Sequence, residues 1–102
     1  MDEKTFENKV KLFLDDLDKT WYFKVWGGGF QRAGIPDIIC NVNGHFVALE
    51  LKSDTGHPSA LQLRNVRLIN ESNGIAMIVY PKDFEKLKIT LKNLLVVRAS
   101  ER

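Results

Sequence analysis

Apolar residues recur at helical spacing near the start of the chain and predict a helix over residues 3–19. They share one stripe of that helix, made up of Phe6, Val10, Phe13, Leu14 and Leu17. Residues 21–26 alternate instead between two faces, which is typical of a strand. The glycines at 27–29 end this strand and begin a loop that runs to about residue 35.

A hairpin is expected after this loop, with strands at 37–42 and 45–52. Between them stands Asn43-Gly44, the dipeptide most typical of a tight two-residue turn. We expect His45, at the edge of this turn, to be exposed.

The second half of the chain predicts a helix, a strand and a further helix. The first helix begins at residue 58 or 59 and ends near residue 72, before an Asn-Gly stop signal. An apolar run at 75–80 is typical of a strand covered on both faces. Asp83 is then placed to cap the last helix, and the tail at 99–102 is expected to fray.

The predicted order is therefore α-β-β-β-α-β-α. A helix that joins two strands of one sheet makes a crossover, so the strand at 75–80 should run parallel to an earlier strand. The expected fold class is α/β, a mixed β-sheet flanked by helices. The 102 residues suit a single domain spanning positions 1–102.

Composition excludes several classes of protein. With 44% hydrophobic and 27% charged residues, the chain is typical of a globular protein. It has no apolar run of the roughly 18 residues that a membrane span needs and no secretory leader, so a cytoplasmic protein with no membrane partner is expected. Cys40 is the only cysteine, and no Cys/His cluster has zinc-ligand spacing. Because the net charge is only +2, a nucleic-acid surface would have to be a local patch.

The register of the hairpin places the candidate chemistry. Counting back from a two-residue turn puts Asp37 directly opposite Glu50, with Cβ atoms about 4.5–5.5 Å apart. Lys52 is two residues beyond Glu50 and shares its face. A four-residue turn over positions 42–45 would keep the same register.

Two carboxylates this close repel each other unless a cation separates them. Hard oxygen ligands suit Mg²⁺ or Mn²⁺, and the charge of Lys52 could orient a water or stabilise a phosphate. The cluster therefore predicts metal-assisted phosphodiester hydrolysis. The alternative is an ordinary charged cluster on a solvated face. Apolar residues on the same face argue against that alternative: Ile35, Ile39, Phe46 and Ala48.

Further candidates carry two interpretations each. Glu7, beside the apolar stripe of the first helix, could point toward the carboxylates or pair with Lys11 at the surface. Gln62 falls inside the apolar arc of its helix, where it could hold Lys52, a metal-bound water or a phosphate, or be a core residue satisfied by backbone. Four basic residues could contact DNA phosphates or be ordinary solvated charges: Arg32, Arg64, Arg67 and Lys82.

Aromatic residues crowd one short stretch of the chain, namely Trp21, Tyr22, Phe23, Trp26 and Phe30. We expect a domain this small to leave part of this group uncovered, and aromatic side chains are enriched in protein interfaces. The stretch therefore predicts a homodimer built on the first strand, the glycine loop or the first helix; the alternative is that it completes the core.

Three elements occur in order along the chain: Gly34-Ile35-Pro36-Asp37, Glu50-Leu51-Lys52, and Gln62 on the following helix. With them the chain resembles the PD-(D/E)XK nuclease superfamily, and more narrowly a stand-alone VRR-NUC domain, the virus-type replication-repair nuclease. The likeness covers residues 6–79. One departure is Pro58-Ser59, where the order Ser-Pro is expected, and this shifts the helix cap.

The resemblance implies a restriction-endonuclease-like core and a role for each motif residue. Asp37, Glu50 and the backbone carbonyl of Leu51 would be metal ligands, and Lys52 would be the catalytic lysine. Gln62 would be the glutamine behind the lysine. Glu7 would be the acid of the first helix, which supports a second metal ion.

The resemblance also implies a substrate. Similar stand-alone domains are Mg²⁺- or Mn²⁺-dependent deoxyribonucleases of phages and bacteria, related to the Holliday-junction resolvases of DNA repair, and often act as dimers. We therefore expect an endonuclease acting on structured DNA, with the four-way junction as the leading substrate. The alternatives are a nuclease for flap or duplex DNA and a non-catalytic DNA-binding or assembly module.

Overall fold

The computed structural model describes residues 1–26 and 33–101. Its elements follow one another as α1 (Glu3–Asp16), β1 (Thr20–Lys24), β2 (Ile38–Val42), β3 (His45–Leu51), α2 (Ala60–Glu71), β4 (Ile75–Val79), the 3₁₀ turn η1 (Pro81–Asp83), α3 (Phe84–Leu94) and the 3₁₀ turn η2 (Ala99–Glu101). The four strands form a single sheet in the order β1-β2-β3-β4.

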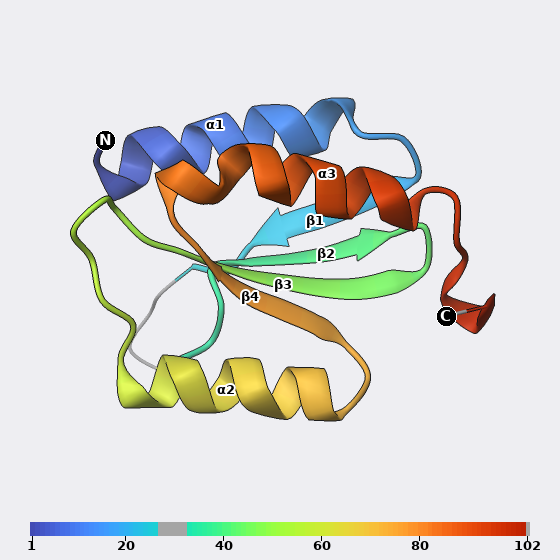
Figure 1. Cartoon of the computed structure of the whole chain (residues 1–102). Coiled ribbons are helices and arrows are strands. Elements are labelled where there is room, and N and C mark those ends of the chain that lie inside the picture. Colours follow the sequence, from blue (N-terminus) through green and yellow to red (C-terminus); the bar gives the residue numbers. More distant parts are fainter. Residues whose placement is uncertain (27–32, 102) are drawn as a thin grey trace.

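The sheet is mixed, and helices cover both of its faces. β1, β2 and β3 pair antiparallel, whereas β3 and β4 pair parallel. Figure 1 shows α1 and α3 on one face and α2 on the other. The α/β class, the mixed sheet and the parallel crossover are thus as predicted. Over the described residues, none of the helices combines the length and the apolar content that crossing a bilayer requires.

The hairpin between β2 and β3 has the predicted register. Asn43 and Gly44 both adopt positive φ angles, of 51° and 87°, which is the geometry of a two-residue turn of type I′. Val42 consequently pairs with His45, and Ile39 pairs with Ala48. Every side chain of the hairpin is therefore committed to one face of the sheet.

The core lies between the sheet and the helices α1 and α3. Its buried members are Phe6, Val10, Leu14, Ile38, Cys40, Val42, Val47, Leu49, Leu51, Val79, Phe84, Leu87 and Leu91. Because alternate residues of a strand face opposite sides, Glu50 lies on the other face, toward α2. α2 packs on β4 and β3, so that face of the sheet is covered only in part.

The C-terminal segment corrects two predictions. His45 is fully buried rather than exposed, and its Nε2 contacts the backbone carbonyl of Val97. Asn43 Nδ2 donates to the carbonyls of Leu94 and Leu95, at 2.8 and 3.2 Å. The end of the chain is thus held against the hairpin turn and forms η2 instead of fraying from residue 99, although Arg102 lies outside the described residues.

Two element ends also differ from expectation. α1 stops at Asp16 instead of running to residue 19, because Leu17 is already extended with ψ 127°. Asp83 occupies the N-cap position of α3, but its carboxylate makes no cap hydrogen bond and accepts instead from the amide of Tyr80 at 3.1 Å. The side chain therefore closes the turn η1 rather than the helix.

Candidate metal centre

Glu50 is a buried carboxylate with one oxygen held and one oxygen free. It is 2% exposed on β3, and its Oε2 accepts from Gln62 Nε2 at 3.1 Å and lies 3.3 Å from Lys52 Nζ. Its Oε1 is buried and has no hydrogen-bond partner among the described residues. Buried polar atoms are almost always paired, so this oxygen is available to a ligand.

Asp37 is fixed beside Glu50 by its own backbone and by its side chain. It directly precedes β2, and its carbonyl accepts from the amide of Val25 at 2.8 Å. Its Oδ2 accepts from the amide of Leu51 at 2.8 Å. The carboxylate therefore reaches across to β3 next to Glu50, as the hairpin register predicted.

The loop before Asp37 is anchored on α2 at a position that requires glycine. Gly34 has φ +84°, and a Cβ there would lie 2.7 Å from the backbone carbon of Leu61. The carbonyl of Gly34 accepts from Asn65 Nδ2 at 2.9 Å. This anchor ties Asp37 to the same helix that carries Gln62.

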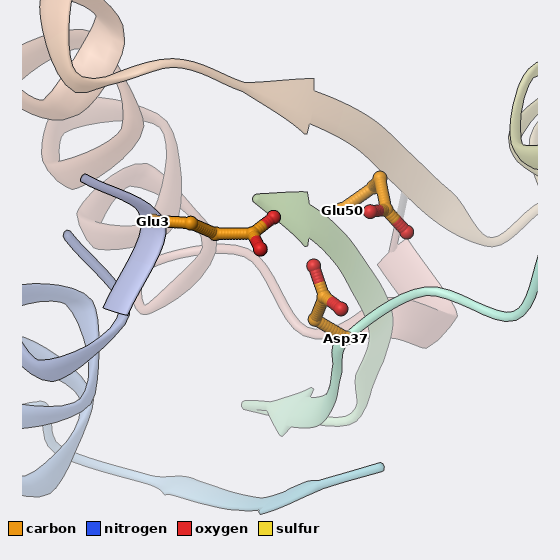
Figure 2. Close-up of side chains that lie close together, drawn as sticks. All are labelled: Glu3, Asp37 and Glu50. Carbon is orange, nitrogen blue, oxygen red and sulfur yellow. The ribbon is translucent and has the colours of Figure 1, made fainter. Parts of the chain in front are cut away.

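The third carboxylate at this place is Glu3, from the first turn of α1. One oxygen each of Glu3, Asp37 and Glu50 lies within 4.8 Å of the others. Figure 2 shows the three side chains arriving from separate segments and gathering in one place. The sequence analysis missed Glu3; the available signal was its position one helical turn before Glu7, on the same side of the helix.

Glu7 lies in a different environment. It is 5% exposed, and its carboxylate is paired with Lys24 at 2.5 Å and with Lys4 and Lys11 at 3.4 Å each. The predicted pair with Lys11 exists, but it belongs to a cluster of three lysines around a buried carboxylate and is not an isolated surface pair. The structure thus gathers Glu3, and not Glu7, with the two hairpin carboxylates.

The electrostatics of the centre favour a bound cation. The pKa of Glu50 is raised to about 7, first by burial and then by the charge of Asp37, with Lys52 opposing the shift. Three carboxylates face one lysine, so negative charge is in excess. Their hard oxygen atoms are the ligands that Mg²⁺ and Mn²⁺ prefer. The residues present therefore fit a divalent metal ion, which Glu3, Asp37 and Glu50 could hold.

Gln62 serves two partners at once. Ser59 is the N-cap of α2, and the two residues form a reciprocal capping box in which Gln62 Oε1 accepts from the Ser59 amide at 2.9 Å. The side-chain nitrogen of Gln62, Nε2, is left to donate to Glu50 Oε2. Gln62 is partly exposed rather than a core residue. The order Pro58-Ser59 therefore still provides an N-cap for α2, because Ser59 takes that position.

The described basic residues that were predicted to contact DNA lie on two elements, Arg64 and Arg67 on α2 and Lys82 in η1. Arg67 pairs with Glu71 at 3.2 Å on the exposed side of α2, which also carries Arg64. Lys82, in η1 between β4 and α3, lies over the ring of Tyr80. Arg32 lies outside the described residues.

No family model, no characterised protein and no solved structure matches this chain. The function of the centre therefore has to be inferred from its own geometry and chemistry.

Proposed function

We propose that this chain is a divalent-metal-dependent nuclease of the PD-(D/E)XK type, similar to a stand-alone VRR-NUC domain and built on a restriction-endonuclease-like core. The observation that carries the proposal is Glu50. A buried carboxylate with a free oxygen stands beside Asp37 and next to a lysine that shares its face. A structural ion pair would need neither the free oxygen nor the second and third carboxylates.

Each residue of the centre has a separate task in this proposal. Asp37 and Glu50 hold the metal ion, joined by the backbone carbonyl of Leu51, and Glu3 takes the place that the resemblance assigned to Glu7. Lys52 orients the attacking water or donates to a phosphate oxygen, since its Nζ lies 3.3 Å from Glu50. When bound, a divalent ion supplies charge neutralisation at the phosphate and lowers the pKa of water.

Gln62 acts as a positioning residue. Its Nε2 donates to Glu50 Oε2 at 3.1 Å, which leaves Oε1 free for a ligand. Its anchor in the capping box fixes that geometry to the helix.

The substrate that we propose is structured DNA, with the four-way junction as the leading candidate. Resolving a junction needs two cuts, and a two-fold dimer would supply two centres. Exposed aromatic residues support such an interface: Trp21 and Phe23 on β1 and Phe46 on β3 lie on the sheet face beside α2 and are 67%, 46% and 47% exposed. Phe30, also predicted for this interface, lies outside the described residues.

One experiment tests the function. The purified protein is incubated with labelled four-way junction, flap and linear duplex, with Mg²⁺, with Mn²⁺, or with excess chelator. Metal-dependent cleavage supports the proposal, and the preferred substrate separates resolvase from flap or duplex nuclease. Binding without cleavage in either metal would favour the non-catalytic module. Sedimentation of the protein alone and on the junction then tests the dimer.

A further inference from the structure

Three lysines surround the single carboxylate of Glu7. Lys24 and Lys11 are mostly covered, with side chains 19% and 27% exposed, whereas the Lys4 side chain is 66% exposed. One negative charge cannot balance three positive charges, so the cluster keeps an excess of two. Because all three ammonium groups contact the buried carboxylate of Glu7, the lysines are held in place around it.

Trp26 extends this cluster along the surface. Its side chain is 72% exposed, and the ammonium of Lys24 lies 5.8 Å from the centre of its ring. A tryptophan gains stability mainly from burial, and this one gains little of it within the chain. Together Lys4, Lys11, Lys24 and Trp26 form what we call the lysine–tryptophan strip.

The strip is connected to the candidate metal centre through two elements, β1 and α1. Val25, between Lys24 and Trp26, donates its amide to the carbonyl of Asp37 at 2.8 Å. On α1, Glu7 follows Glu3 by four residues, a distance of about one helical turn. Lys24 pairs with Ile38 and so faces α1, on the other side of the sheet from Glu50. A strand whose phosphate lies at the metal centre would therefore reach the strip around the end of the sheet where Glu3 joins Asp37 and Glu50.

We infer that the lysine–tryptophan strip binds an unpaired nucleic-acid strand next to the reacting phosphate, with phosphates on the lysines and a base stacked on Trp26. Cationic grooves with exposed aromatic rings are how proteins hold single strands, because every unpaired base offers a face for stacking. In a duplex the bases are already stacked on each other. The inference deepens the proposed nuclease function, on which it rests, and assigns a substrate with an unpaired segment beside the cut, which favours the flap alternative over the fully paired four-way junction.

The second tryptophan of the chain provides a matched control. Trp21 is nearly as exposed as Trp26, at 67%, but its ring lies 5.7 Å from that of Phe23 and belongs to the aromatic face of β1. On α1, Lys9 is likewise exposed but lies over the ring of Phe84, away from Glu7. Neither residue belongs to the strip.

Fluorescence can read the proposed contact directly. The chain has two tryptophans, so Trp21→Phe leaves Trp26 as the only one, and Trp26→Phe leaves Trp21. Oligothymidylate of about 10 nucleotides, a length within known single-strand site sizes, is added in the presence of chelator so that no cleavage occurs. Emission should be quenched in Trp21→Phe and stay unchanged in Trp26→Phe.

Affinities measured in chelator complete the test. Trp26→Ala should weaken oligothymidylate binding about tenfold, whereas Trp21→Ala should leave it unchanged. Lys4→Gln should reduce the slope of log affinity against log salt by about 0.7, and Lys9→Gln should not. A blunt duplex should bind with no dependence on Trp26.

Equal losses of affinity in Trp21→Ala and Trp26→Ala would overturn the inference, and so would dissociation of a dimer by Trp26→Ala without any quenching of Trp26. The second outcome would make the strip a protein interface. Metal-dependent cleavage that does not depend on Trp26 would refute the strip and leave the nuclease proposal intact. Quenching of Trp26 by oligothymidylate in a protein that cleaves no substrate would support the strip as a binding site and refute the nuclease proposal.

Discussion

Two buried glutamates of this fold, Glu50 and Glu7, have opposite electrostatic surroundings. Glu50 shares its place with Glu3 and Asp37 and has Lys52 as a cationic partner, and one of its oxygens is free. Glu7, one turn of α1 away from Glu3, is paired with three lysines. The pKa of Glu50 is raised to about 7, whereas the pKa of Glu7 is lowered.

Burial alone does not explain this difference. Burial raises the pKa of both groups, but at Glu7 the hydrogen bond and charge of Lys24, together with those of Lys11 and Lys4, outweigh it. At Glu50 the charge of Asp37 adds to the effect of burial. Glu7 is therefore a satisfied structural charge, and Glu50 is an unsatisfied one that is stabilised when a cation binds. Stability is commonly sacrificed in this way at functional sites.

The largest effect is expected on the rate of cleavage when Lys52, the cationic partner of Glu50, is replaced. Lys52→Ala should lower kcat for cleavage about 10²- to 10³-fold, because a charge that acts on the reacting phosphate or water is lost. DNA binding measured in chelator should change little. Lys86→Ala, at an exposed position on α3, provides the control for loss of a lysine. Near-normal turnover in Lys52→Ala would show that this lysine only balances Glu50.

Neutralising each glutamate should change stability in opposite directions. Glu7→Gln leaves three lysines without their counter-charge and should lower the free energy of unfolding by about 2 kcal/mol. Glu50→Gln removes a repelled, buried charge and should raise it by about 1 kcal/mol at pH 8 without metal, while cleavage is lost. Urea unfolding of both variants measures the difference. Destabilisation of similar size in both would remove the distinction between the two glutamates.

The pH dependence of stability should separate the two groups. A folded pKa of about 7 for Glu50, above the ordinary value of 4.5, means that the folded state binds more protons between these values. Stability of the metal-free protein should therefore fall as pH rises from about 4.5 to about 7. The lowered pKa of Glu7 has the opposite sign: its contribution is present above pH 4.5 and is lost as pH falls through its folded pKa.

Unfolding curves at a series of pH values, with Glu50→Gln and Glu7→Gln alongside, check this assignment. Glu50→Gln should flatten the decline between pH 4.5 and 7, and Glu7→Gln should flatten the loss below pH 4.5. If the decline above pH 4.5 survives in Glu50→Gln, another group causes it.

The surroundings of Glu50 could be predicted from the sequence because the local geometry of the hairpin turn decides them. A two-residue turn sets the register of the hairpin, and the register alone sets Asp37 against Glu50 and puts Lys52 on their face. The surroundings of Glu7 depend instead on how α1 packs against the sheet, which the sequence pattern does not determine. A displacement of one turn decides whether Glu3 or Glu7 reaches the carboxylates, and the apolar stripe of α1 is compatible with both.

His45 shows the same limit. Its position beside the turn was correctly predicted, but a strand residue at a turn is buried or exposed according to what packs over it. Here a segment about fifty residues later in the chain covers it, with the carbonyl of Val97 at its ring. Periodicity within the hairpin carries no information about that contact.

The smallest expected effect concerns Gln62, whose two contacts can be separated by substitution. Gln62→Ala loses both the cap on Ser59 and the hold on Glu50, so it should lower stability by less than about 1 kcal/mol and cleavage about tenfold. Gln62→Glu keeps an acceptor for the amide of Ser59, as in the usual capping box, but adds a fourth carboxylate to the centre, next to Glu50. Stability without metal should then fall as pH rises toward 8, and cleavage should be slower than in Gln62→Ala. If capping is the only task of Gln62, Gln62→Glu will cleave like the unaltered protein, and the orientation of Glu50 will have to come from Lys52 alone.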